Sequence, residues 1–199
     1  MEALEAIFAR RSVGRLVEPG PGEADLRTVL EAAAAAPDHG ELRPWRFVVL
    51  SGTAKDAFGG VLADAYLARC AAGGVHPTDG QVAKERTKLG RAPVVVVLAA
   101  VHRPSDAIAW EEQLAAGAAA AENALVAATA LGYGSMWRTG DPASDPVVKA
   151  ALGLAPDDAI VGFLYLGTPA EGAAKAPRRP DLAGLVEYWS PPPPTGPPG

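Results

Sequence analysis

Val94-Val95-Val96-Val97-Leu98 is an uninterrupted run of aliphatic residues, most of them β-branched. Such a run favours a strand, and since no alternate position is polar, we expect that strand to be covered on both faces. The apolar stretch is also far shorter than the ~20 residues that a membrane-spanning helix requires. It therefore predicts a central strand of a layered soluble fold, with helices packed against both sides of a sheet.

Two further apolar runs lie elsewhere in the chain, one before and one after this strand. Phe47 to Leu50 and Ile160 to Leu166 have the length of buried strands, and Gly167-Thr168-Pro169 ends the second. The remaining periodicity is helical. Helices are predicted over residues 2–11, 23–36, 53–72 and 78–89, from Ser105 to about Leu131, and from the Asp145-Pro146 start to about Gly153. Helices alternating with a few strands indicate α/β or α+β packing in layers.

The length of 199 residues suits one domain. We expect that domain to occupy residues 1–189, followed by a Pro-rich tail over 190–199 without a role in the core. The long helix before Leu131 is unusually rich in alanine, and small side chains allow another helix to approach closely. This helix is therefore predicted to be central or to lie at an interface.

Composition excludes several classes of function. The formal net charge of −5 argues against nucleic-acid binding, which depends on many basic residues that neutralise phosphates. A single cysteine, Cys70, cannot form an intramolecular disulfide, and the three histidines are scattered without metal-ligand spacing. The first fifteen residues lack the apolar core of a signal peptide. These features predict a cytoplasmic protein with no metal, no nucleic-acid partner and no membrane partner.

Two short segments carry basic residues at the ends of predicted elements. Arg10-Arg11-Ser12 closes the first helix, and Trp137-Arg138-Thr139-Gly140 follows the Ala-rich helix. A guanidinium offers a rigid fork of donors and a serine adds a compact one, so the set suits a phosphate monoester. Taken alone, the arginines are equally well explained as solvated charges at a helix end, and Trp137 as a core aromatic.

A third segment decides between these readings. Ala36-Pro37-Asp38-His39 leads to Pro44-Trp45, and with the two basic segments it resembles the FMN-dependent nitroreductase family, especially its small bacterial members. The resemblance covers roughly residues 1–190. It implies an α+β fold with a mixed central sheet flanked by helices, assembled as an intertwined homodimer with two FMN sites at the interface.

The resemblance also implies site residues. FMN would be bound by Arg10, Arg11, Ser12, Ala35, His39, Trp137, Arg138 and Thr139. A nicotinamide cofactor would lie near the end of the Ala-rich helix, at Ala127, Ala128, Thr129, Ala130, Leu131 and Gly132. No side chain is assigned a catalytic role, because flavin N5 carries the hydride. Many family members have Gln before the Pro-Trp pair, whereas Arg43 stands here, which would favour an acidic or phosphorylated substrate group.

The implied function is an oxidoreductase that uses NADH or NADPH. Hydride would pass through FMN to an electron-poor nitroaromatic or quinone in a ping-pong mechanism. Two alternatives stay open: a specialised flavin dehydrogenase or reductase of a biosynthetic pathway, and a flavin-binding or sequestering protein without significant turnover. Gly132-Tyr133-Gly134 lacks a third glycine and follows a helix, so it does not indicate a dinucleotide-binding fold.

Overall fold

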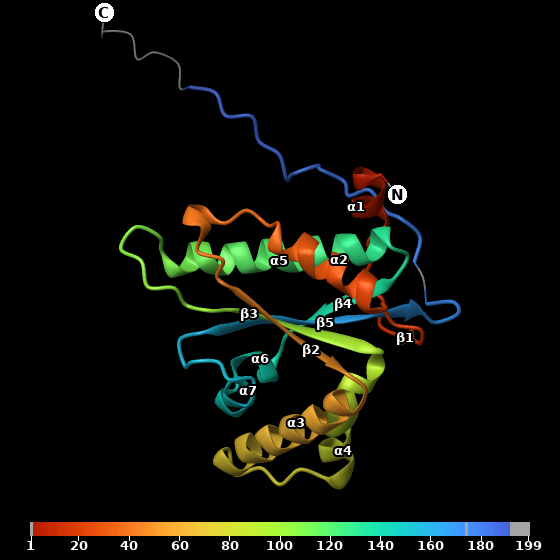
Figure 1. Cartoon of the computed structure of the whole chain (residues 1–199), viewed down its shortest axis with the longest axis vertical. Helices are drawn as coiled ribbons and strands as arrows, with labels where there is room; N and C mark the ends of the chain where they lie inside the picture. Colours follow the sequence, from red (N-terminus) through yellow and green to blue (C-terminus); the bar gives the residue numbers. More distant parts are fainter. Residues whose placement is uncertain (1, 174, 192–199) are drawn as a thin grey trace, which may run out of the picture.

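The computed structural model describes residues 2–173 and 175–191, and Figure 1 shows a central sheet between two groups of helices. In chain order the elements are α1 (Ala3–Ala9), β1 (Leu16–Val17), α2 (Glu23–Ala34), the 3-10 turn η1 (His39–Glu41), β2 (Trp45–Ser51), α3 (Gly52–Ala72), α4 (Asp79–Thr87), the 3-10 turn η2 (Lys88–Arg91), β3 (Val94–Ala100), α5 (Trp110–Ala130), β4 (Gly134–Arg138), α6 (Asp141–Ser144), α7 (Pro146–Ala151) and β5 (Ala159–Pro169).

The sheet has the order β1-β5-β3-β2, and β4 pairs with β5 on the side away from β3. All named strand pairs are antiparallel, while a single parallel bridge joins Ser12 to Ser135. The predicted α+β fold with a mixed sheet is confirmed in this form. Because β4 lies beyond β5, it is an edge strand for most of its length.

Strand β3 is buried over its whole length, as its sequence predicts. Its side chains alternate between two cores. Val94, Val96 and Leu98 pack with α2 and α5, whereas Val95, Val97 and Ala99 pack on the opposite face with α3 and α7. Figure 1 shows these helices on opposite sides of the sheet.

The Ala-rich helix α5 packs closely against α2, and Ala120, Ala121 and Ala128 in α5 are fully buried. Its predicted start at Ser105 is wrong, because the helix begins at Trp110. The Ser105 hydroxyl accepts hydrogen bonds from the N–H groups of Ala107 and Ile108, and thereby closes a local turn. Serine favours such turns as readily as helix starts, so the sequence alone did not separate the two.

Strands β1 and β4, helix α6 and the 3-10 turn η1 were not predicted. Strand β4 contains Gly, Ser and Arg, so its sequence carries little strand signal, and pairing with β5 holds it in place. Strand β5 is longer than expected and includes Thr168 and Pro169, which pair with β1. None of the helices in the described ranges is sufficiently long and apolar to cross a membrane.

The C-terminal segment leaves the domain as an extended chain (Figure 1). Within it, Tyr188 and Trp189 are 92% and 80% exposed, and Leu185 is 74% exposed. Most of the expected Pro-rich tail, residues 192–199, lies outside the described part of the chain. The apolar side chains before it therefore have no cover from the part of the chain that the structure describes.

Replacement of Gly59 by Ala should destabilise the domain. A Cβ at Gly59 would overlap the carbonyl oxygen of Arg86, so α4 would have to move away from α3. We expect a loss of about 1–3 kcal/mol, as for overpacked cores. The matched control is Gly60→Ala, where the nearest atom, Arg86 Nη1, lies 3.6 Å from the added Cβ. Since alanine favours the helix over glycine, Gly60→Ala should be neutral or stabilising in urea denaturation.

Candidate functional site

The edge of β4 is where the two basic segments come together. The N–H of Val13 donates to the carbonyl of Ser135 over 2.9 Å, next to the Ser12–Ser135 bridge. The backbone groups of Ser135 therefore point away from β5. The backbone N–H and C=O groups of successive strand residues point to alternate sides, so the backbone groups of Trp137 also point to the free edge of β4. Three residues of strand, ~10 Å, separate Ser135 from Arg138. Backbone donors and acceptors thus line the path between Ser12 and Arg138.

At the Ser12 end of this edge lies an open pocket of about 810 Å³, here called the N-terminal pocket. Its lining comprises Ile7, Phe8, Arg10, Arg11, Glu122, Lys175, Ala176, Arg178, Pro180 and Asp181. Four of these side chains are cationic and two are acidic. The pocket therefore has an excess of positive charge in a protein whose formal net charge is −5. Such a site suits a small dianion.

Arg11, which lines this pocket, has one donor without a partner. Its Nε donates to the carbonyl of Ala176 over 3.1 Å and its Nη1 to the carbonyl of Arg10 over 2.8 Å. Its Nη2 is buried and has no hydrogen-bond partner among the described residues, and neither does the buried hydroxyl of Ser135. An unsatisfied buried donor is costly, so a small shift of the Arg11 side chain that brings Nη2 to an oxyanion in the pocket would remove that cost.

Arg10 is partly neutralised by an ion pair. Its Nε lies 3.0 Å from Glu122 Oε1 of α5, and the two side chains are 28% and 48% exposed. A pair this exposed contributes little to stability, about 0–1 kcal/mol. A phosphate can therefore displace Glu122 from Arg10 at small cost.

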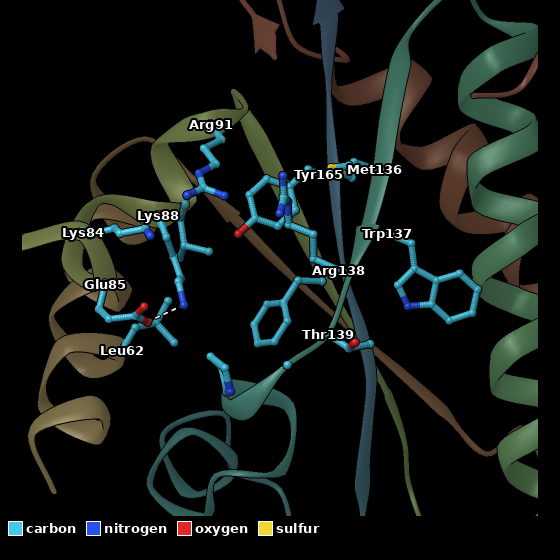
Figure 2. A pocket seen from close by; sticks show the side chains of 14 residues that line it. Leu62, Lys84, Glu85, Lys88, Arg91, Met136, Trp137, Arg138, Thr139 and Tyr165 are labelled. Atoms are coloured by element: carbon cyan, nitrogen blue, oxygen red, sulfur yellow. Dashed lines mark ion pairs between the residues drawn. The ribbon is translucent and has the colours of Figure 1, made fainter. Parts of the chain in front are cut away.

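At the other end of the β4 edge lies a second pocket of about 540 Å³, the α4 pocket (Figure 2). Its lining comprises Leu62, Lys84, Glu85, Lys88, Leu89, Arg91, Met136, Trp137, Arg138, Thr139, Gly140, Pro142, Phe163 and Tyr165. The floor is apolar and aromatic, while the four cations face a single acidic residue. That residue, Glu85, forms an ion pair with Lys88. Lys84, Arg91 and Arg138 remain as positive charges without such a pair in the described structure.

Alternation along β4 separates its two largest side chains. Figure 2 shows the indole of Trp137 pointing away from the α4 pocket, toward α5, whereas Arg138 extends into the pocket. The indole Nε1 donates to the carbonyl of Val161 over 3.1 Å, and the ring packs against the core on the α5 face. Trp137 therefore has a packing role whatever its backbone binds.

Tyr165 of β5 lies beneath Arg138, whose guanidinium carbon is 5.6 Å from the centre of the phenol ring. The side chain is only 4% exposed, and its hydroxyl points into the α4 pocket (Figure 2). Burial raises the pKa of Tyr165 above its ordinary value, although the charges of Arg138 and Arg91 act in the opposite direction. The phenol therefore stays protonated and remains a hydrogen-bond donor at neutral pH.

His39 and Ala35 lie outside both pockets. His39 Nδ1 lies 2.7 Å from Glu112 Oε2 in the first turn of α5, and this hydrogen bond holds the pKa of Glu112 below its ordinary value. Arg10 contacts the same helix at Glu122, ten residues later, which is ~15 Å along the axis. Ala35 is the exposed C-cap of α2. A single protomer thus does not gather all the residues expected to bind FMN.

The segment expected to meet the nicotinamide lies at the C-terminal end of α5. Ala128 is fully buried, and the Thr129 hydroxyl donates to the carbonyl of Leu125 over 2.9 Å. Ala130, Leu131 and Gly132 are exposed. Ala127 and Thr129 are partly exposed, so of these six residues only Ala128 has no surface that a ligand could contact.

The structure adds basic residues that sequence reasoning missed. Lys175 and Arg178 join the N-terminal pocket from the loop after β5, and Lys84 and Arg91 join the α4 pocket from the region of α4. The sequence held one available signal, the Arg178-Arg179 pair that follows Lys175 in a Pro-containing loop. No cluster of three potential metal-ligating His, Cys, Asp or Glu side chains occurs in residues 2–173 and 175–191.

Comparison with known proteins identifies the class. The model of the nitroreductase family matches residues 7–168, and the chain belongs to this oxidoreductase family. It is 37% identical over 190 residues to the Escherichia coli K12 protein YdjA, named as a candidate NAD(P)H nitroreductase, and this match covers 95% of the chain and 100% of YdjA.

Solved structures show the same fold. A Bacillus cereus nitroreductase-like protein superposes with a TM-score of 0.77 at 22% identity, and the match covers 95% of this chain and 96% of that one. A Bacteroides fragilis nitroreductase with bound FMN superposes with a TM-score of 0.72 at 27% identity, covering 96% and 100% of the two chains. The resemblance stated from the sequence is therefore confirmed at the level of family and fold.

Proposed function

We propose that this protein is an FMN-dependent oxidoreductase that takes hydride from NADH or NADPH and delivers it to an electron-poor acceptor, a nitroaromatic or a quinone, in a ping-pong mechanism. The observation that carries the proposal is the pair of cation-lined pockets at the two ends of the free β4 edge. The names of the relatives and the FMN in the Bacteroides fragilis structure agree with it.

The N-terminal pocket fits the phosphate of FMN. Arg10, Arg11, Lys175 and Arg178 would surround a dianion, and the unpartnered Nη2 of Arg11 supplies a donor that the protein itself does not use. Ser12, exposed beside the start of β4, would add a hydroxyl. One cation-lined pocket at this end accounts for a monophosphate, and this favours FMN over FAD.

The far end of the β4 edge fits the isoalloxazine ring. The backbone N–H and C=O of Trp137 and Thr139 would pair with polar atoms at the ring edge, as a neighbouring strand would. Arg138 would place a positive charge beside the ring. The ~10 Å between Ser135 and Arg138 suits the ribityl chain that joins ring to phosphate.

Bound FMN supplies the redox chemistry by accepting hydride at N5 and passing it on. Backbone groups at the end of β4 would hold the ring, and the positive charge of Arg138 would favour added electron density on it. The apolar residues that line the α4 pocket, including Leu62 and Phe163, would pack against an acceptor that lies beside the ring. We expect no side chain to form a covalent bond with substrate.

A second protomer would complete the site. His39 and Ala35 lie outside both pockets of their own chain, so their expected contact with FMN requires them to reach the cofactor of a partner. The exposed apolar residues between Leu182 and Trp189 are suited to cover such a partner. A two-fold dimer is the commonest assembly and would give two equivalent FMN sites.

The decisive test is anaerobic. Purified protein reconstituted with FMN should carry one FMN per chain by mass spectrometry of the released cofactor. NADH or NADPH should bleach its absorbance, and a quinone or nitroaromatic should restore it. Bleaching without reoxidation by any acceptor would favour a flavin-sequestering protein. Retention of FAD, or no retained flavin, would contradict the proposal that the protein is FMN-dependent.

Binding of FMN should also tighten the dimer. Since both chains are expected to contribute to each site, FMN stabilises the assembled form by linkage, and the melting temperature should rise with FMN concentration. Sedimentation at several protein concentrations, with and without FMN, measures this shift. A monomer that still carries FMN and turns over at assay concentration would refute the shared site.

A further inference from the structure

The α4 pocket contains more positive charge than a neutral substrate requires. In the proposed function Arg138 lies beside the ring, whereas Lys84 and Arg91 have no assigned role. Lys88 already forms an ion pair with Glu85, so Lys84 and Arg91 account for the excess positive charge of the pocket. Both are exposed at the mouth of the pocket, where a charged group is free to enter.

A second observation points to the same ligand chemistry. The hydroxyl of Tyr165 lies on a side chain more than nine-tenths buried, makes no hydrogen bond within the described structure, and points into the pocket between the pocket floor and the cations (Figure 2). The oxygen itself stays accessible from the pocket, so a ligand in the pocket can be its hydrogen-bond partner. A protonated phenol donates a hydrogen bond, so the missing partner is an acceptor. Because Lys84 and Arg91 place positive charge at the same pocket, we expect this acceptor to be an anion.

The surrounding walls define the rest of the ligand. Leu62, Leu89, Met136 and Phe163 line the pocket beside Tyr165, and a flat aromatic body packs well against such a set. A phosphate alone would leave these apolar walls uncovered. An aromatic acid uses both the walls and the cations.

We propose that the α4 pocket recognises electron acceptors that carry a carboxylate on an aromatic ring, with the carboxylate held by Arg91 and the hydroxyl of Tyr165, and with Lys84 at the rim. This inference names the substrate class of the proposed flavin site and rests on that proposed function. It makes Arg91 and Tyr165 specificity residues, which act on acid-bearing acceptors and not on the redox step itself.

The first experiment compares 4-nitrobenzoate with its neutral analogue 4-nitrobenzamide, using NADH-driven turnover of the FMN-loaded protein. The ratio of the two kcat/KM values reports recognition of the carboxylate, because effects common to both acceptors cancel. Arg91→Gln should lower this ratio roughly tenfold to hundredfold, the effect of a lost charge-assisted contact. Tyr165→Phe, which removes only the hydroxyl, should lower it about threefold to tenfold. Arg86→Gln is the matched control on α4, since Arg86 does not line this pocket, and it should leave the ratio unchanged.

The second experiment needs no turnover. Benzoate, which is not reduced, should bind the FMN-loaded protein more tightly than benzamide in calorimetry, and Arg91→Gln should abolish the difference. If neutral quinones are reduced but the acid-to-amide ratio is the same in wild type and Arg91→Gln, the proposal is overturned while the flavin function stands. A change confined to the NADPH-to-NADH ratio in Arg91→Gln would also overturn it, since the anion would then be the 2′-phosphate of the donor. Absence of FMN or of NADH oxidation would instead be a failure of the proposed function.

Discussion

Replacement of Asp145 by Ala should lower the free energy of unfolding by about 3 kcal/mol. The carboxylate is 4% exposed, accepts hydrogen bonds from the N–H groups of Val147 and Val148 at the start of α7, and forms an ion pair with Arg69 of α3. Its loss removes a helix cap and leaves a guanidinium without its partner. Breaking a buried pair costs about 3–5 kcal/mol, and the lower end applies because the Arg69 side chain is 30% exposed.

Urea denaturation measures this difference, and two variants define its origin. Asp145→Asn keeps an acceptor for the helix start but removes the charge, so its effect should be intermediate. Glu31→Ala breaks the exposed pair between Arg27 and Glu31, whose side chains are 79% and 63% exposed, and should change stability by less than about 0.5 kcal/mol. Equal, small effects of Asp145→Ala and Glu31→Ala would show that the Arg69–Asp145 pair does not hold α7 to α3.

Replacement of Arg11 by Met should weaken FMN binding roughly tenfold to hundredfold, which is about 1.5–3 kcal/mol for a charge-assisted contact. The folded apoprotein should lose little stability, because in the absence of phosphate Arg11 holds a buried Nη2 without a partner. Affinity can be measured by titrating apoprotein with FMN and following the quenching of flavin fluorescence. The urea midpoint of the apoprotein supplies the independent measure of folding.

Arg179→Met is the matched control for this prediction. Arg179 follows Arg178 directly, but its guanidinium carbon lies 4.2 Å from the centre of the Phe8 ring, and the side chain does not line the N-terminal pocket. Its replacement should leave FMN affinity within about twofold. If Arg179→Met and Arg11→Met weaken FMN equally, the effect is general electrostatics. If Arg11→Met lowers the urea midpoint of the apoprotein and leaves FMN affinity unchanged, Arg11 is structural.

The fold was largely predictable because its strongest signals are local. The aliphatic run that starts at Val94 identified β3, and Asp145-Pro146 identified the start of α7, which Asp145 caps with its side chain. The prediction went wrong where one residue type serves two local structures, as Ser105 does. Strand β4 was missed because pairing with β5 decides its conformation, and its own composition does not.

The candidate site was predictable only in part. The family resemblance correctly identified the nitroreductase class, and the individual site residues remain predictions. Sequence reasoning joined Arg10, Arg11 and Arg138 in one anion site. In the structure Arg138 lines a different pocket from the other two, with the β4 edge between them. Contributions from loops distant in the chain, such as Lys175 or Arg91, carry no periodic signal that marks them in advance.

By itself the sequence determined most of the helices, the three long strands and the faces of these elements, because hydrophobic periodicity is a local property that survives into the folded state. It also determined the family, through the order and spacing of three short segments that resemble it. Tertiary structure alone decided where charges meet: it placed Arg91 beside Tyr165, and left Arg11 Nη2 without a partner. The reason is physical. Burial and pairing depend on which segments pack together, and strand order in a sheet brings together residues that are far apart along the chain.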